Sequence, residues 1–398
     1  MPYPRIFIII CLAAFCTLLP YSIVLPMLPL YAARELHASD ETVGLVVSSF
    51  FIARICIELP GGLIADRIGR RKPIILGMFL SFAGGLVLSL APNIALLMLG
   101  RAVWGAGTAL FLTATYSLLF DLFPPSFRGK STGTFQSVEL VGSFIGAPIG
   151  GTLAEFFGIK QIFYLSVVIL AVGLVITSLY KGLKIEGEVR KGHEHTHFSL
   201  KTAVNLFKNW GLIVVSIGAF VRLLLLQGIK ATILPIYLDG FGISEVWIGL
   251  VVGVSSLGQI FATLISGMIT RKTGSKRMLL IGFALDSIAV LSYAFTDRLE
   301  FFIPISFLEG SASGIELINL TVLVSDIAPA NARGASLGVY RTFLDAGAIV
   351  GPIALTFINM ATNNVKSCFY FSSLLVAATF FITLTLKETY DKTGNVNY

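Results

Sequence analysis

The feature that most constrains this chain is a succession of apolar runs, each about 20 residues long, with short polar breaks between them. A helix of this length and composition crosses the hydrocarbon core of a bilayer. We count twelve runs and expect each to be a transmembrane helix. The predicted spans are 6–31, 42–65, 73–91, 94–120, 131–157, 161–180, 211–238, 246–270, 277–296, 299–326, 335–360 and 367–386. The predicted fold class is therefore an all-α membrane protein with twelve transmembrane helices.

Composition agrees with a chain whose main solvent is lipid. Of 398 residues, 55% are hydrophobic and only 13% are charged, and the mean hydropathy is +0.85. The first run is too long for a signal peptide and lacks a small-x-small cleavage site, so we expect it to stay in the mature protein. The cysteines lie inside apolar runs, where they cannot form an extracellular disulfide framework.

Basic residues are distributed unevenly between alternate connections. One set of connections holds 20 lysines and arginines and the other holds four. Because basic loops stay on the cytoplasmic side, this asymmetry predicts a multi-pass protein of a prokaryotic inner membrane with both termini in the cytoplasm. The net charge of +7 does not indicate a nucleic-acid partner, since the charges lie in short loops without a basic helix or an aromatic stacking surface.

The chain repeats itself at a fixed offset of 205 residues. GLIADRIGRRK (62–72) aligns with GMITRKTGSKR (267–277), and the same offset pairs Gly142 with Gly347. An offset that covers six helices preserves topology, so it predicts two pseudo-symmetric, parallel six-helix bundles. The predicted parts are 1–180, a cytoplasmic linker at 181–210, and 211–398.

Three segments resemble motifs of the major facilitator superfamily. GLIADRIGRR (62–71) is similar to the signature between its second and third helices, LMLGRAVWGAG (97–107) to the motif of proton-coupled members, and GSFIGAPIGG (142–151) to the motif of drug/proton antiporters. The last match has its proline, Pro148, one residue late.

This resemblance covers nearly the whole chain and implies the major facilitator fold, alternating access and no enzymatic activity. It favours proton-coupled efflux of a small amphipathic solute, as in a multidrug or metabolite exporter. A proton symporter or facilitator for uptake of a small metabolite is the alternative. We expect its partners to be the solute, protons and lipid. We also expect a monomer without a cofactor.

The first motif is interpreted as a cytoplasmic latch, because glycines permit a turn that tightens and loosens while an acid at a helix end pairs with arginines. Simple anchoring by basic residues is the alternative. The predicted latch residues are Gly62, Asp66, Arg67, Gly69, Arg70 and Arg71.

Glycines at a spacing of four residues let helices approach closely. The resemblance places such glycines at the seam between the halves, as bearing surfaces of a rocking motion; packing without gating is the alternative. The glycines are Gly142, Gly146, Gly150, Gly249, Gly253, Gly347 and Gly351.

Ionisable residues within the predicted spans are candidate functional sites, because each costs about 2.5–3.5 kcal/mol on insertion scales unless it is paired or faces water. The candidates for the proton-coupling and substrate cavity are Arg54, Glu58, Arg101, Glu139, Arg222, Lys230, Glu309, Glu316, Arg341 and Asp345. Internal neutralisation of the i,i+4 pairs Arg54–Glu58 and Arg341–Asp345 is an equal interpretation.

Arg101 and Glu139 carry the coupling hypothesis. A buried guanidinium holds a carboxylate ionised until a proton or substrate competes for it, and Glu139 is the candidate carboxylate. A purely structural salt bridge from Glu139 to Arg101 or Arg54 is the alternative. We expect Asp286 to be peripheral and structural, since the resemblance places its helix on the outside of the bundle.

The central loop contains His193-Glu194-His195-Thr196-His197, which satisfies the H-E-x-x-H pattern of zinc proteases. A linker supplies neither the stable helix nor the third ligand that such a site needs. We therefore predict a solvated linker and no metal centre, with loose binding of a metal by the histidines as the alternative.

Overall fold

The computed structural model describes residues 4–180, 206, 209–329 and 333–386, and every regular element in these residues is helical. The predicted 181–210 linker, with its histidine pattern, lies almost entirely outside the described residues, and so do the first three residues and those after 386. The domain boundaries therefore stay a prediction.

The helices follow the predicted spans closely. The first half contains α1 (Arg5–Val24), α2 (Leu28–Arg34), α3 (Asp40–Ile68), α4 (Arg71–Leu90), α5 (Ile94–Leu122), α6 (Pro125–Phe157) and α7 (Ile159–Leu179). The second half contains α10 (Trp210–Leu225), η1 (Leu226–Ile233), α11 (Leu234–Gly240), α12 (Glu245–Thr273), α13 (Ser275–Tyr293), α14 (Leu299–Ile327), α15 (Arg333–Thr362) and α16 (Lys366–Leu384).

Local chemistry explains where several helices begin and end. Asn93 caps α5, because its side chain accepts a hydrogen bond of 3.0 Å from the backbone N–H of Leu96, and Asn209 caps α10 in the same way. Gly69, with φ 83°, ends α3, and Gly158, with φ 92°, ends α6. Glycine adopts this left-handed region without the steric cost that a side chain brings.

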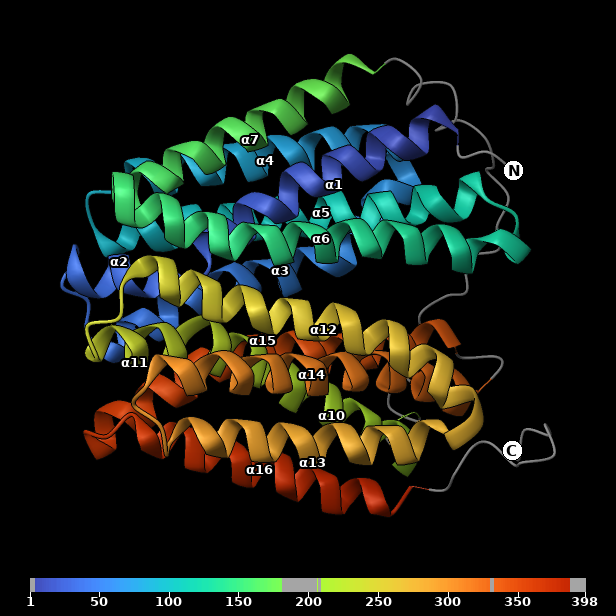
Figure 1. Ribbon diagram of the computed structural model, residues 1–398. Helices are drawn as coiled ribbons and strands as arrows, with labels where there is room; N and C mark the ends of the chain where they lie inside the picture. The colour runs from blue at the N-terminus through green and yellow to red at the C-terminus, as the bar shows by residue number, and fades with distance from the viewer. Residues whose placement is uncertain (1–3, 181–205, 207–208, 330–332, 387–398) are drawn as a thin grey trace. The chain divides into compact units, whose positions relative to one another are not determined.

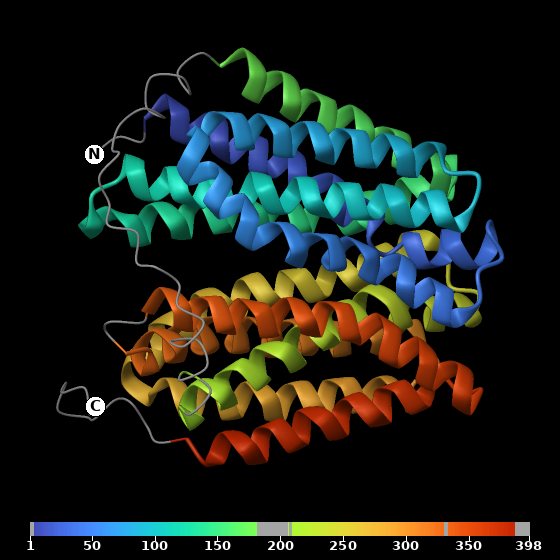
Figure 2. The same ribbon diagram turned by 180° about the vertical axis from the view of Figure 1, so that it is seen from behind.

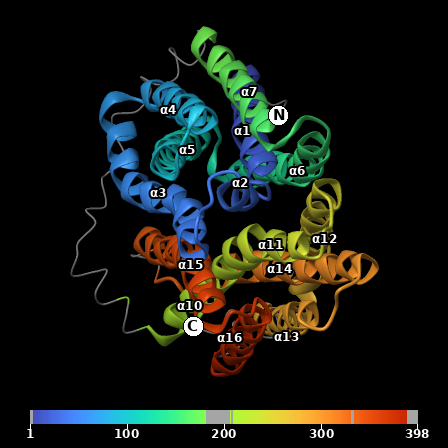
Figure 3. The same ribbon diagram turned by 90° about the vertical axis from the view of Figure 1, so that its left-hand side faces the viewer.

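Contacts divide the chain into two compact units. Unit 1 comprises Met1–Glu194 with Ser244–Gly249, and unit 2 comprises His195–Ile243 with Leu250–Tyr398. Within unit 1, α5 packs against α3 and α4, while α1 packs against α6 and α7 (Figures 1 and 2). Within unit 2, α14 packs against α13 and α10, α10 against α15, and α13 against α16, as the view along the helices shows (Figure 3).

The repeat extends to the helix boundaries and to the backbone. The bounds of α3 and α12 differ by 205 residues at both ends, and so do those of α5 and α14. In the described residues the backbone adopts positive φ at three pairs of positions that are also 205 apart. These pairs are His37 and Gly242, Gly69 and Gly274, and Gly158 and Asn363.

Close helix packing repeats in the same register. A Cβ atom at Gly105 of α5 would lie 2.0 Å from the carbonyl oxygen of Phe50 in α3, and one at Gly310 of α14 would lie 1.8 Å from that of Ser255 in α12. The members of each matched pair are 205 residues apart, so the same backbone approach occurs once in each unit. Each unit is thus built by the same packing rule, with small residues where helices touch.

Among the described residues, ten spans are long and apolar enough to cross a membrane. Helices α3 and α13 are not among these ten spans, and both carry charged residues, including Arg54 and Glu58 in α3 and Asp286 in α13. Their repeat counterparts, α12 and α4, are among them. Twelve membrane helices, as predicted, account for the fold.

The seventh span is continuous but irregular in its middle. Between α10 and α11 the chain forms the π-helical turn η1, in which Thr232 Oγ1 donates to the carbonyl oxygen of Gln227 at 2.7 Å. The equivalent place in the first span is a turn between α1 and α2 that contains Pro26. Single π-helical turns often mark functional positions, and this one holds the buried Lys230.

Candidate functional site

Arg101 of α5 is fully buried in unit 1, where its guanidinium group contacts aromatic rings instead of water. Its guanidinium carbon lies 4.7 Å from the ring centroid of Phe50 and 5.5 Å from that of Tyr21. One guanidinium N–H donates to the carbonyl oxygen of Val47 at 3.4 Å, while Nε and Nη1 have no acceptor among the described residues. The two ring faces stabilise the charge electrostatically where water is excluded.

Glu139 of α6 lies away from that guanidinium. Its carboxylate accepts a hydrogen bond of 3.2 Å from the hydroxyl of Tyr116, a residue of α5, and is half-buried. The partners of Arg101 instead come from α1 and α3, so the structure does not bring Arg101 and Glu139 into contact. A role for either residue in coupling stays a prediction.

The two intrahelical pairs differ in their surroundings. Arg54 and Glu58 are half-buried on α3, with the Arg54 guanidinium 6.0 Å from the ring of Phe51. On α15, Arg341 is exposed and Asp345 is buried. Both pairs keep the spacing of one helical turn, and their function stays a prediction.

Basic residues of unit 2 converge on buried oxygen atoms. Arg222 Nε donates to the carbonyl oxygen of Ser313 on α14 at 3.2 Å. Lys230 Nζ donates to Ser256 Oγ on α12 at 3.1 Å, and its ammonium lies close enough to Glu309 and Arg222 to interact with both charges. The π-helical turn thus directs a lysine into the centre of the unit.

Acidic residues occupy the same interior. Glu309 of α14 accepts a hydrogen bond of 2.5 Å from Ser255 Oγ of α12. Glu316, two turns further along α14, is completely buried and lies beside Asp286 of α13. The structure therefore gathers all four charged residues predicted for this half, the pair on α15 aside, and adds a fifth.

The expectation that Asp286 is peripheral is wrong. Its exposed fraction is only 2%, and it faces Glu316 in the core of unit 2. A signal was present in the sequence: Asp286 follows Gly282 by one helical turn, and Gly282 is the repeat counterpart of Gly77, a glycine that packs closely on α5. The glycine face of α13 is the face that meets α14, and it carries the aspartate there.

Most of the predicted seam glycines contact helices of their own half. Cβ atoms at Gly142, Gly146 and Gly150 of α6 would contact α1, and those at Gly347 and Gly351 of α15 would contact α10. Close approach of small residues is thus present, but the partner of each of these two stripes is the first helix of its own half, whereas Gly249 of α12 meets α6. The closest approach of Gly249 is to Gly151 and Ala147 of α6, within unit 1.

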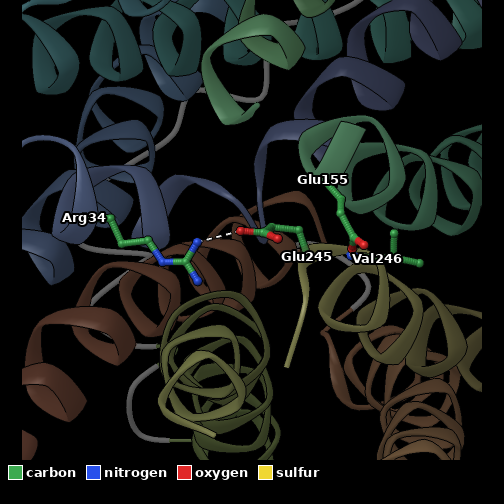
Figure 4. Close-up of polar contacts among 4 residues, drawn as sticks. All are labelled: Arg34, Glu155, Glu245 and Val246. Carbon is green, nitrogen blue, oxygen red and sulfur yellow. Dashed lines mark hydrogen bonds and ion pairs between the residues drawn. The ribbon is translucent and has the colours of Figure 1, made fainter. Parts of the chain in front are cut away.

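The first turn of α12 is held by charged residues that were not among the predicted site residues (Figure 4). Arg34 Nη1 pairs with Glu245 Oε1 at 2.5 Å. Glu155 Oε2 accepts a hydrogen bond of 3.0 Å from the backbone N–H of Val246, so a carboxylate from α6 neutralises the positive end of the helix dipole.

The predicted latch region also contains an ion pair. Arg70 Nε lies 3.0 Å from Asp121 Oδ2 at the end of α5. The surroundings of Gly62 and of the Asp66 side chain are not among the described ones, whereas Arg67 is exposed. The acid that meets the latch arginine in the described residues is therefore Asp121, and the gating role stays a prediction.

A duplicated bundle of membrane helices that keeps ionisable side chains in its interior is the construction of a secondary transporter. The chain belongs to the Major Facilitator Superfamily, which it matches over residues 10–230 and 215–397. It is a multi-pass membrane protein of a family of transporters rather than enzymes.

Relatives and solved structures agree with this assignment. The chain is 26% identical to Multidrug resistance protein 2 of Bacillus subtilis, covering 98% of both chains, and 24% identical to the inner membrane transport protein YajR of Escherichia coli, covering 92% of this chain and 79% of the relative. A structure of the nucleoside transporter NupG shares the fold, with a TM-score of 0.79 at 15% identity over 96% of this chain and 99% of that chain.

Proposed function

We propose that this transporter exports a small amphipathic solute in exchange for protons across a prokaryotic inner membrane. The observation that carries the proposal is the similarity to Multidrug resistance protein 2, which extends over nearly the full length of both chains. A second relative, the quinolone resistance protein NorA of Staphylococcus aureus, is 28% identical over 35% of this chain and 36% of its own.

Proton coupling is supported by the ionisable groups inside the membrane helices. A group that is withdrawn from water changes its charge at a high energetic cost, and this cost is what lets proton binding bias a conformational equilibrium. Arg101 supplies a fixed positive charge in unit 1, and Glu139, which is half-buried, is the proposed exchanging carboxylate.

Uptake of a small metabolite is the second candidate. It is favoured by the position of Pro148, which lies inside α6 one residue later than in the antiporter motif. The fold is also shared with a nucleoside transporter, at 15% identity, and with a peptide transporter, at a TM-score of 0.76 and 17% identity over 96% of this chain and 93% of that one.

Transport in inverted membrane vesicles tests the proposal. In vesicles acidified by respiration, an exported solute should dissipate the proton gradient, which a pH-sensitive dye reports. Glu139→Gln should abolish this coupling while solute counterflow continues, because the amide carries no exchangeable charge. Glu41→Gln, an exposed acid at the start of α3, is the matched control and should behave as the wild type. Solute uptake that acidifies the lumen on symport would favour the second candidate instead.

A further inference from the structure

The interior of unit 2 holds more acids than bases. Arg222, Lys230, Asp286, Glu309 and Glu316 each have an exposed fraction of 5% or less. They come from four different elements, α10, η1, α13 and α14, and their charged groups are three carboxyl groups and two cations. If every group were ionised, the cluster would keep an uncompensated negative charge away from water, which is strongly unfavourable.

Glu309 already has its charge compensated. Its carboxylate accepts a hydrogen bond from Ser255, and Lys230 lies near enough to interact with it. Lys230 is in turn fixed to Ser256. These contacts account for one acid and one base, and they leave Arg222 to balance two further carboxyl groups.

Those two groups face each other without another donor. If both groups are ionised, the two carboxyl oxygens of Glu316 have no hydrogen-bond donor among the described residues. The same holds for at least one of the two oxygens of Asp286. Yet the two side chains lie within hydrogen-bonding distance of each other. Two carboxylates can only accept hydrogen bonds, so this contact forms only when one of the two carries a proton.

Packing keeps the two groups together. A Cβ atom at Gly282 would lie 3.1 Å from the Cγ atom of Glu316, so the glutamate stem lies against the bare backbone of α13. Asp286 is one helical turn further along the same face. The absence of a side chain at Gly282 is therefore what lets Glu316 reach the aspartate.

We propose that Asp286 and Glu316 form a proton-binding site in which the two carboxyl groups share a single proton. With that proton, the site carries one negative charge, which Arg222 balances, and the cluster of five residues is neutral. When the proton leaves, two carboxylates face each other and both depend on Arg222. The guanidinium then leaves the carbonyl oxygen of Ser313 and turns toward the pair, which pulls α10 toward α14.

The neighbours of the pair come from each helix packed around it. The charged groups near enough to interact are Arg222 from α10 and Glu309 from α14, while Tyr293 of α13 interacts with Asp286. The Tyr293 hydroxyl is held by Ser306 at 2.7 Å. From the other sides, α12 contributes the hydroxyls described above, Tyr340 of α15 lies near Arg222, and Ser373 of α16 pairs with Ser287 of α13.

The role of this site in transport rests on the proposed function, whereas the binding of a proton by the site does not. Binding of the proton is a property of unit 2 itself, and it can be measured without a solute. If protons drive exchange, release of the proton from this pair is a step of the transport cycle. This step takes place in the second half of the chain and is separate from proton release by the carboxylate proposed on α6.

Infrared spectroscopy of the full chain in lipid bilayers tests the site directly. A protonated carboxyl group has a C=O stretching band that an ionised carboxylate lacks, so raising the pH should remove one band from the wild type. Asp286→Asn and Glu316→Gln should each eliminate that band, because an amide N–H replaces the shared proton as donor. Glu300→Gln, an exposed acid on the same helix α14, is the matched control and should keep the band.

Isotope labelling provides a measurement that needs no variant. Carbon-13 in the carboxyl groups of aspartate or of glutamate should shift the titrating band of the wild type with at least one label. A band that persists in both single variants, or the absence of any titrating carboxyl band in the wild type, would overturn the proposal. Loss of the band in the variants together with pH-independent solute flux in the wild type would leave the proton site intact and refute proton-driven exchange instead.

Discussion

The substitution Gly310→Ala tests the packing that holds α14 against α12. The new methyl group would lie 1.8 Å from the carbonyl oxygen of Ser255, whereas ordinary contact begins at 3.4 Å. The oxygen belongs to the backbone of α12 and the methyl carbon is fixed to the backbone of α14, so no flexible side chain can move aside. The two helices must separate, and Ser255 Oγ then loses its contact with the carboxylate of Glu309, the residue just before Gly310.

The magnitude follows from these two effects. Overpacking costs about 1–3 kcal/mol, and loss of a hydrogen bond to a charged group costs about 1.5–3 kcal/mol. For a unit of about 200 residues, a total of about 2.5–6 kcal/mol lowers the melting temperature by roughly 5–24 °C. The measurement is thermal unfolding of the purified protein in detergent, followed by intrinsic fluorescence.

The repeat provides a replicate and the chain provides a control. Gly105→Ala should act similarly in unit 1, where the methyl group would lie 2.0 Å from the carbonyl oxygen of Phe50. Gly338→Ala in α15 meets no atom within 4 Å and should raise stability by about 0.5–1 kcal/mol, since alanine favours a helix over glycine. If Gly310→Ala and Gly338→Ala melt at the same temperature, backbone contact does not fix α14 on α12 and the argument is refuted.

Three further substitutions probe charges outside the acidic pair. Arg101→Lys keeps the charge but loses the planar contact with two rings, so we expect a loss of about 1–3 kcal/mol in thermal stability, and an unchanged melting temperature would contradict the cation–π account. Glu155→Gln removes the charge that accepts the Val246 N–H, so amide hydrogen exchange in the first turn of α12 should become faster by mass spectrometry; equal rates would exclude the cap. Asp121→Asn breaks a partly exposed ion pair with Arg70 and should cost about 0–1 kcal/mol at low salt and nothing at high salt, and a cost that persists in high salt would point to another role.

The fold was readable from the sequence because the bilayer imposes a one-dimensional constraint. Every spanning helix needs a run of apolar residues of fixed length, so the spans appear in order along the chain. The offset of 205 then predicts the repeat. In the structure, the bounds of matched helices and the paired positive-φ positions show the same offset. The three motifs at 62–71, 97–107 and 142–151 indicated the family that nearly the whole chain matches.

The sequence also identified which residues carry charge inside the membrane, but not which of them meet. Contacts between buried side chains depend on the rotation of each helix about its axis and on how close its neighbour comes, and these are set by packing across residues far apart in the chain. Arg101 therefore faces two aromatic rings rather than Glu139, and the glycines of α6 contact α1. Only the tertiary structure placed Asp286 against Glu316, because Gly282 leaves the space through which the two helices bring those carboxyl groups together.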